Sequence, residues 1–99
     1  MKSNFKDIIH SENLVLIDFS AEWCGPCQTL APILKDLKSE IGDVVKIVKV
    51  DVDRNQPLAS HFSIRSVPTM ILFKNGQEVW KGSGVMTKAD LIRTIKSHQ

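Results

Sequence analysis

The chain has 99 residues, 42% of them hydrophobic, and its 13 basic and 11 acidic residues leave a formal charge of +2. A chain of this length forms one domain, expected to span residues 1–99, and can bury a modest core without a metal or disulfide staples. The basic residues form no cluster, which argues against nucleic-acid binding and anionic membrane surfaces. No apolar run matches a signal peptide or a membrane span, so we expect a cytoplasmic protein without membrane contacts.

The first half of the chain predicts two strands joined by a helix. Residues 4–10 carry apolar side chains at helical spacing, with Ser3 or Asn4 available as N-cap. Residues 14–19 are almost continuously apolar, which favours a central strand covered on both faces. Residues 44–52 read as a second strand, and strand-helix-strand in this order implies a right-handed parallel crossover. The helix between them has an apolar stripe of Leu30, Ile33, Leu34, Leu37 and Ile41.

The second half predicts a short helix or turn, a hairpin and a closing helix. Residues 57–62 form the short segment, and strands at 69–73 and 78–81 flank Asn75-Gly76. Asn-Gly supplies the positive φ values of a type I′ turn, so these strands are expected to be antiparallel. Gly82 and Gly84 interrupt the pattern, and Thr87 is a plausible N-cap for the closing helix, whose buried stripe is Leu91, Ile92 and Ile95. The fold class is therefore α/β, a four-stranded mixed sheet with helices on both faces.

The only two cysteines, Cys24 and Cys27, lie two residues apart where the first strand gives way to a helix. Such a pair can close a disulfide with little backbone movement. At a helix start the first sulfur faces unpaired backbone N–H groups and the positive end of the macrodipole, which favour the thiolate. A fall in thiol pKa from about 8.5 to about 7 raises the thiolate share at pH 7 from a few per cent to about half. The spacing therefore predicts redox exchange.

Three other interpretations of the pair are weaker. A structural disulfide across so small a loop would restrict the unfolded chain by only roughly 2 kcal/mol. A zinc site needs two further ligands, yet the three histidines have no ligand spacing and there is no second Cys-x-x-Cys. Two inert buried cysteines fit poorly with the polar neighbours Glu22 and Gln28. We therefore expect no metal, and His10, His61 and His98 are assigned no role.

Three further residues are candidates for the site. Asp18 interrupts the first apolar strand, where burial would raise its pKa; it is either a proton carrier or a structural side chain that satisfies local backbone groups. Lys49, between two valines, either pairs with Asp18 or packs its stem while its ammonium reaches water. For Pro68 the sequence by itself favours a trans bond, since only about 5–6% of X-Pro bonds are cis.

Residues 18–27 (DFSAEWCGPC), with 67–69 (VPT) and 73–76 (FKNG), resemble the thioredoxin family. The resemblance runs from about Phe5 to the C-terminus. It implies a thioredoxin fold that reduces protein disulfides, with Cys24 as attacking thiolate, Cys27 as resolving thiol and no bound cofactor beyond the redox-active disulfide of these two. A dedicated thioredoxin reductase would supply the electrons. Gly-Pro between the cysteines resembles the reducing members of the family.

The same resemblance assigns roles around the cysteines. It implies that Asp18 exchanges a proton with Cys27, and that the bond before Pro68 is cis and faces the disulfide. Lys49 is included among the catalytic candidates as the cation of the neighbouring strand, not on the resemblance. The resemblance also implies an apolar docking patch for disulfide-bearing segments, made of Trp23, Gly25, Pro26, Val67, Gly84 and Val85. Trp80 and Met86 are interpreted as packing residues.

The chain also departs from the family pattern. Family members usually begin with an additional edge strand; here it is expected to be missing, which would expose the edge of strand 44–52, where Lys46 discourages unwanted pairing. Ser20 stands where many bacterial members have a second Trp, and Gln28 where Lys is common. We expect a monomer. The alternatives are an oxidase or isomerase of an exported compartment, and a thioredoxin-fold binding module or subunit.

Overall fold

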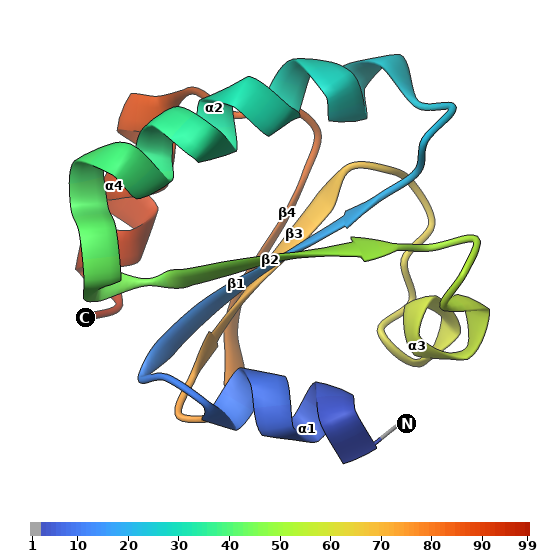
Figure 1. The fold of residues 1–99 in the computed structure, drawn as a ribbon, viewed down its shortest axis with the longest axis horizontal. Coiled ribbons are helices and arrows are strands. Elements are labelled where there is room, and N and C mark those ends of the chain that lie inside the picture. The colour runs from blue at the N-terminus through green and yellow to red at the C-terminus, as the bar shows by residue number, and fades with distance from the viewer. Residues whose placement is uncertain (1–2) are drawn as a thin grey trace.

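The computed structural model describes residues 3–99, which form four strands flanked by helices (Figure 1). Each predicted element is present, with ends shifted by a few residues. In chain order the elements are α1 (Ser3–His10), β1 (Leu14–Ser20), α2 (Gly25–Ile41), the 3₁₀ turn η1 (Gly42–Val44), β2 (Lys46–Asp51), α3 (Gln56–His61), β3 (Thr69–Lys74), β4 (Gln77–Ser83) and α4 (Lys88–Ser97).

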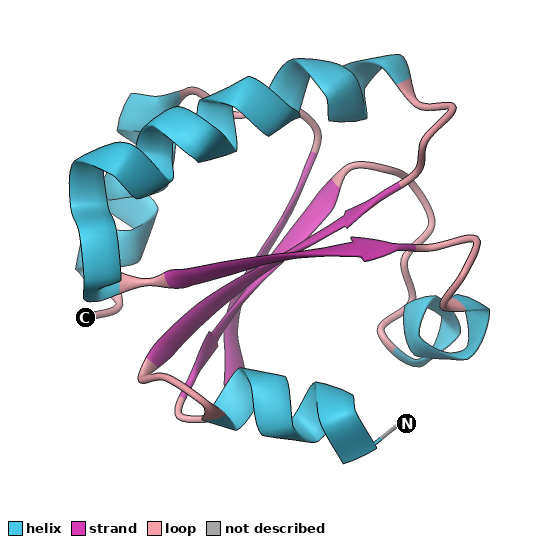
Figure 2. Cartoon of the chain, viewed as in Figure 1, coloured by secondary structure: helices cyan, strands magenta, loops and turns pink. Residues whose placement is uncertain are grey.

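The strands form one mixed sheet in the order β2-β1-β3-β4 (Figure 2). β1 runs parallel to β2 and antiparallel to β3, and β3 and β4 form the predicted hairpin. All seven residues of β1 are buried, as expected for a central strand. β2 is an edge strand: in residues 3–99 no other strand pairs with its outer side. The four-stranded sheet with an uncovered β2 edge is thus the predicted architecture.

Alternation along β1 divides the core into two layers. Leu14 and Leu16 pack into a cluster with residues of α2 and α4, whereas Val15, Ile17 and Phe19 pack into a second cluster that includes residues of α1. Figure 1 shows α2 and α4 on one side of the sheet and α1 and α3 on the other. Because strand side chains alternate between faces, Asp18 continues the row that faces α2.

Local signals account for the turns and the last helix. Asn75 and Gly76 have φ values of 51° and 83°, as a type I′ hairpin requires. The Thr87 side chain accepts the N–H of Asp90 and caps α4, which confirms the predicted N-cap. Trp80 and Met86 pack against the cluster between the sheet and α2 with α4, as expected.

Three boundaries differ from the prediction. Ser3 and Asn4 already lie inside α1, so neither is its N-cap, and the preceding residue lies outside the described range. β2 begins at Lys46 because the residues from Gly42 turn the chain, with Lys38 Nζ donating to the Gly42 carbonyl at 2.8 Å. β4 continues through Gly82, which does not interrupt it. Glycine is needed there because a Cβ at this position would lie 2.5 Å from the Trp80 ring.

Candidate active site

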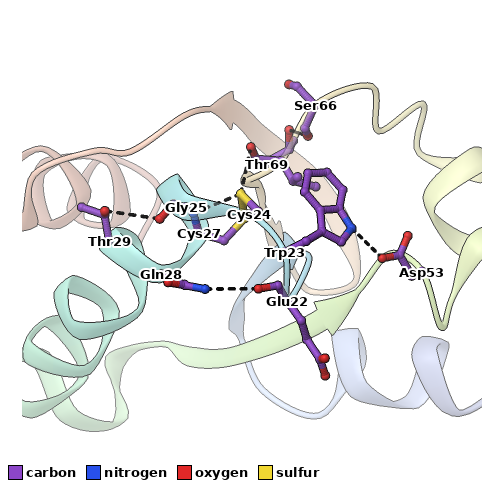
Figure 3. The surroundings of a disulfide bond; sticks show 11 residues. Glu22, Trp23, Cys24, Gly25, Cys27, Gln28, Thr29, Asp53, Ser66 and Thr69 are labelled. Atoms are coloured by element: carbon purple, nitrogen blue, oxygen red, sulfur yellow. Dashed lines mark hydrogen bonds between the residues drawn. A yellow bond between two sulfur atoms is a disulfide. The ribbon is translucent and has the colours of Figure 1, made fainter.

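The two cysteines are held where β1 passes into α2. The Cys24 N–H donates to the Ala21 carbonyl at 3.3 Å, which turns the chain at the end of β1. Cys24 is the N-cap of α2, and the N–H of Cys27 donates to its Sγ at 3.2 Å (Figure 3). The two residues form a disulfide, with Cα atoms 5.3 Å apart. The predicted pair is therefore in its oxidised state.

This arrangement favours a thiolate at Cys24 once the disulfide is reduced. Its sulfur occupies the N-cap position, where a backbone N–H already points at it and the helix dipole is positive. Cys27 lies within the first turn of α2, and both cysteines are buried, at 4% and 3% exposed. Chemically, the pair can serve as an attacking sulfur and a second sulfur within reach of it.

The segment that precedes β3 lies against the disulfide. The Val67-Pro68 bond is cis, as the resemblance led us to expect. The Val67 carbonyl oxygen is 3.5 Å from Cys24 Sγ, and Val67 packs against the cluster formed by Ala21 and the two cysteines. The Gly84 N–H donates to the Pro68 carbonyl at 2.9 Å, so the chain beyond β4 is tied to the same segment.

The residues expected to form the docking patch surround this segment. Trp23 is 72% exposed, Val85 is 42% exposed, and Gly25 and Pro26 are also exposed. The Trp23 indole N–H donates to Asp53 Oδ2 at 2.8 Å, which fixes the ring beside the disulfide (Figure 3). The structure therefore presents exposed apolar surface around Cys24.

Asp18 and Ser20 form a buried polar row beneath this site. They are 2% and 0% exposed, and alternation places both on the face of β1 that packs against α2. Asp18 Oδ1 and Ser20 Oγ have no hydrogen-bond partner in residues 3–99. Burial raises the pKa of Asp18 to about 6, although the positive charge of Lys49 lowers it in part. The carboxyl group can therefore gain or lose a proton near neutral pH.

Lys49 lies opposite Asp18 in the β1–β2 register, but its side chain is exposed. No ion pair joins the two in the part of the chain that the structure describes. Of the two interpretations of Lys49 that the sequence left open, pairing with Asp18 is therefore wrong, and the ammonium reaches water because β2 is an edge strand. Lys49 acts on Asp18 only through its charge.

Sequence reasoning did not find the contacts made by the segment after β2. Besides the Asp53 bond to Trp23, Arg54 pairs with Glu22 at 3.4 Å. Asp51 Oδ1 accepts the N–H groups of Asp53 and Arg54 and so shapes this turn. Since β1 and β2 are parallel, their carboxyl ends meet at one edge of the sheet. The polar residues Asp53, Arg54 and Asn55, which follow the end of a strand, were the available signal.

Two features, a metal-binding cluster and a membrane-spanning helix, are not found in residues 3–99. No group of three or more His, Cys, Asp or Glu side chains among them is placed to hold a metal ion. None of the helices described is long and apolar enough to span a bilayer.

Comparisons with known proteins give a consistent result. The family profile described as Thioredoxin matches residues 1–97. A thioredoxin of Chlamydia trachomatis is 49% identical over 98 residues, covering 99% of this chain and 94% of that protein. A Mycobacterium leprae protein named bifunctional thioredoxin reductase/thioredoxin is 44% identical over 94% of this chain, which is 20% of its own length. The solved structure of a mutant thioredoxin from Halobacterium salinarum superimposes with a TM-score of 0.89 at 39% identity, covering 98% of this chain and 84% of that one.

Proposed function

Because the chain belongs to the thioredoxin family and is a protein-disulfide reductase of that type, we propose specific roles for the residues around its redox-active disulfide. The observation that carries the proposal is the position of Cys24 Sγ at the N-cap of α2, accepting the Cys27 N–H at 3.2 Å. No cofactor takes part, since the cysteine pair itself holds the two electrons.

Reduction of a substrate proceeds in two exchanges. The Cys24 thiolate attacks one sulfur of the substrate disulfide, forming a mixed disulfide and expelling the other substrate sulfur as a thiolate, which takes a proton. Cys27 then loses its proton and attacks Cys24 Sγ, which releases the second substrate sulfur as a thiolate that takes up the second proton. The protein leaves with the Cys24–Cys27 disulfide, and the substrate has gained two electrons and two protons.

Asp18 is the proton acceptor for Cys27 in the second exchange. It lies on the β1 face that packs against α2, the helix that carries Cys27, and its pKa of about 6 lets it take up and release a proton near neutral pH. Lys49 contributes through its charge, which opposes the effect of burial and keeps the carboxyl group titratable in this range. In this proposal Asp18 acts on Cys27 and Lys49 acts on Asp18, and neither residue contacts the substrate.

The docking patch binds the segment that carries the substrate disulfide. Trp23, Gly25, Pro26 and Val85 supply exposed surface for it, and the half-buried Val67 and Gly84 complete the patch. Pro68 lacks an N–H, so the backbone before it offers its carbonyl groups to an extended substrate segment. Such a patch selects disulfide-bearing segments that are apolar and accessible, and it does not require one defined sequence.

The family implies protein disulfides as substrates and thioredoxin reductase as the electron source. The printed name of the Mycobacterium leprae relative, which joins both proteins in one chain, supports this pairing. We further propose that the chain acts as a monomeric single domain, residues 1–99, in the cytoplasm.

Trapping variants test the assignment of the two sulfurs. Cys27→Ser should accumulate a mixed disulfide between Cys24 and a protein substrate such as insulin, because the second exchange is blocked, whereas Cys24→Ser should trap little and turn over none. Nonreducing electrophoresis and thiol titration report both. Equal trapping by the two variants would overturn the assignment.

The reduction potential of the Cys24/Cys27 couple tests the direction of the reaction. A potential near or below about −250 mV fits a reductant, whereas one above about −200 mV fits an oxidase or isomerase.

A further inference from the structure

A groove lies on the outer edge of the sheet, along β2 and between α1 and α3. It has a volume of about 600 Å³. Most of its walls are apolar, from residues of α1 (Phe5, Ile8), β2 (Val48, Val50) and α3 (Pro57, Leu58), and the polar residues Asn4, Lys49, Arg54 and Asn55 also line it. Figure 1 shows β2 at the edge of the sheet, with α1 and α3 on one side of it. The groove is distinct from the docking patch, none of whose residues lines it.

Within residues 3–99, the backbone of β2 has hydrogen-bonding groups along this groove that pair with no other strand. Val52 N–H donates to the Ser20 carbonyl, and in a parallel ladder alternate residues bond to the neighbouring strand. Val48 and Val50 therefore bond to β1, while Ile47 and Lys49 direct their N–H and C=O groups to the open edge. Such a row is a template for an added strand.

Side chains alternate across this edge, so an added strand would meet two different surfaces. Val48 packs on the α1 and α3 side, beside the groove, whereas Ile47 packs on the α2 side. Lys49 shares the face of Ile47, and its side chain is exposed. One set of alternate side chains on an added strand would enter an apolar groove, and the other set would lie beside an ammonium group.

We propose that the β2 edge binds an extended segment of a partner protein in which apolar and acidic residues alternate. The apolar side chains fill the groove against Ile8 and Leu58, the acidic ones face Lys49, and the backbone pairs with Ile47 and Lys49. A second copy of the chain fits less well. A symmetric antiparallel pairing centred on Lys49 would set two ammonium groups opposite each other, and like charges in that position are destabilising.

Amide hydrogen exchange tests the proposal in the oxidised protein, independently of its redox activity. The ligand is a short peptide of alternating valine and glutamate, about eight residues long, and the control peptide has lysine in place of glutamate. The amides of Ile47 and Lys49 should exchange fast in the free protein and slowly with the valine–glutamate peptide. Those of Val48 and Val50 should be protected in both states and serve as internal controls. No added protection at saturating peptide would overturn the proposal.

Reversing the charge at residue 49 distinguishes this specific binding from nonspecific hydrophobic binding. Lys49→Glu should weaken binding of the valine–glutamate peptide by about tenfold and strengthen binding of the valine–lysine peptide, because the apolar walls of the groove are unchanged and the charge that faces the peptide is reversed. Leu58→Ala should weaken both peptides, whereas Val79→Ala, on the opposite edge strand β4, should weaken neither. Equal affinity of the two peptides for the unmodified protein would overturn the proposed partner chemistry. Protection of Ile47 and Lys49 that rises with protein concentration alone would assign the edge to a second copy instead.

Discussion

The two faces of the sheet are built on different principles, although both are covered by helices. The face under α1 and α3 is apolar, and its four phenylalanines pack together: Phe62 has ring centroids 5.6 to 6.0 Å from those of Phe5, Phe19 and Phe73. The face under α2 holds Asp18 and Ser20, each with a buried polar atom that has no partner in residues 3–99. The first face is packed for stability, whereas the second buries polar atoms beside the redox pair at a cost in stability.

The contrast is sharpest at neighbouring residues of one strand. Phe19 and Asp18 follow each other in β1, at 0% and 2% exposure, yet point to opposite layers. A polar group buried without a partner typically costs about 1 to 3 kcal/mol. The same strand therefore carries a stabilising and a destabilising side chain side by side, and the comparison can be tested one face at a time.

The largest effect on stability is expected on the aromatic face. Phe19→Ala should lower the free energy of unfolding by about 3 to 5 kcal/mol, because it opens a cavity in a fully packed cluster. Urea unfolding of the oxidised protein measures this. Val79→Ala, at an exposed position of β4, is the control and should change it by less than about 0.5 kcal/mol. A loss under about 1 kcal/mol at Phe19 would mean that this face is loosely packed.

Asp18→Asn should raise the free energy of unfolding, the opposite of the effect expected for Phe19→Ala. With a pKa of about 6 the native carboxyl keeps a proton that the unfolded chain has lost, so stability falls as pH rises from about 4 to about 6 and stays low above that. The variant lacks this fall and should be about 2 to 3 kcal/mol more stable at pH 7. Unfolding curves at several pH values measure it. The second thiol exchange should slow at least about tenfold above pH 6. A more stable variant with unchanged exchange would refute the proposed proton transfer.

Ser20→Ala tests the other unpartnered atom on this face. Removing a buried hydroxyl without a partner should raise the free energy of unfolding by about 1 kcal/mol. Ser83→Ala is the matched comparison, because that hydroxyl lies 3.2 Å from Thr69 Oγ1 and its removal should destabilise slightly. Thermal unfolding of both variants gives the two signs. If both alanine variants lose stability, the Ser20 hydroxyl is hydrogen-bonded after all, and the proposed difference between the two faces does not hold at this residue.

The smallest change in stability is expected at the rim where both faces end. Asp53→Ala should alter the free energy of unfolding by less than about 0.5 kcal/mol, since the residue is exposed. It frees the Trp23 indole, so the fluorescence of that ring should change and KM for a protein disulfide should rise by about fivefold while kcat stays constant. Asp43→Ala, also exposed but lying in η1, is the control. An unchanged KM would show that the orientation of Trp23 does not matter for docking.

Local patterns were sufficient for the elements and for the redox pair. Continuous apolar character identified β1, Asn-Gly identified the hairpin, and two cysteines at a strand-to-helix junction indicated the chemistry. The cis bond at Pro68 is different: the residues by themselves favour trans, and only the resemblance to a family indicated otherwise. A property set by tertiary packing has no local signal at one proline.

The points that the sequence left open or missed have the same origin. Lys49 between valines indicates a strand but not whether that strand is central or at an edge, and its position at the edge decides whether the ammonium is buried. The bond from Trp23 to Asp53 joins residues 30 apart, and it depends on two parallel strands ending together. Sequence patterns with short periods describe elements, whereas these contacts belong to the arrangement of elements.

The central position of β1 also separates catalysis from unfolding. β1 is hydrogen-bonded to a strand on each side, so opening it would disrupt the whole sheet, whereas the end of a helix is the kind of region that opens locally. The sulfur atoms lie at the junction between these two regions. Repeated oxidation and reduction can therefore proceed as small local openings of a helix end, leaving the register of the sheet intact through every turnover.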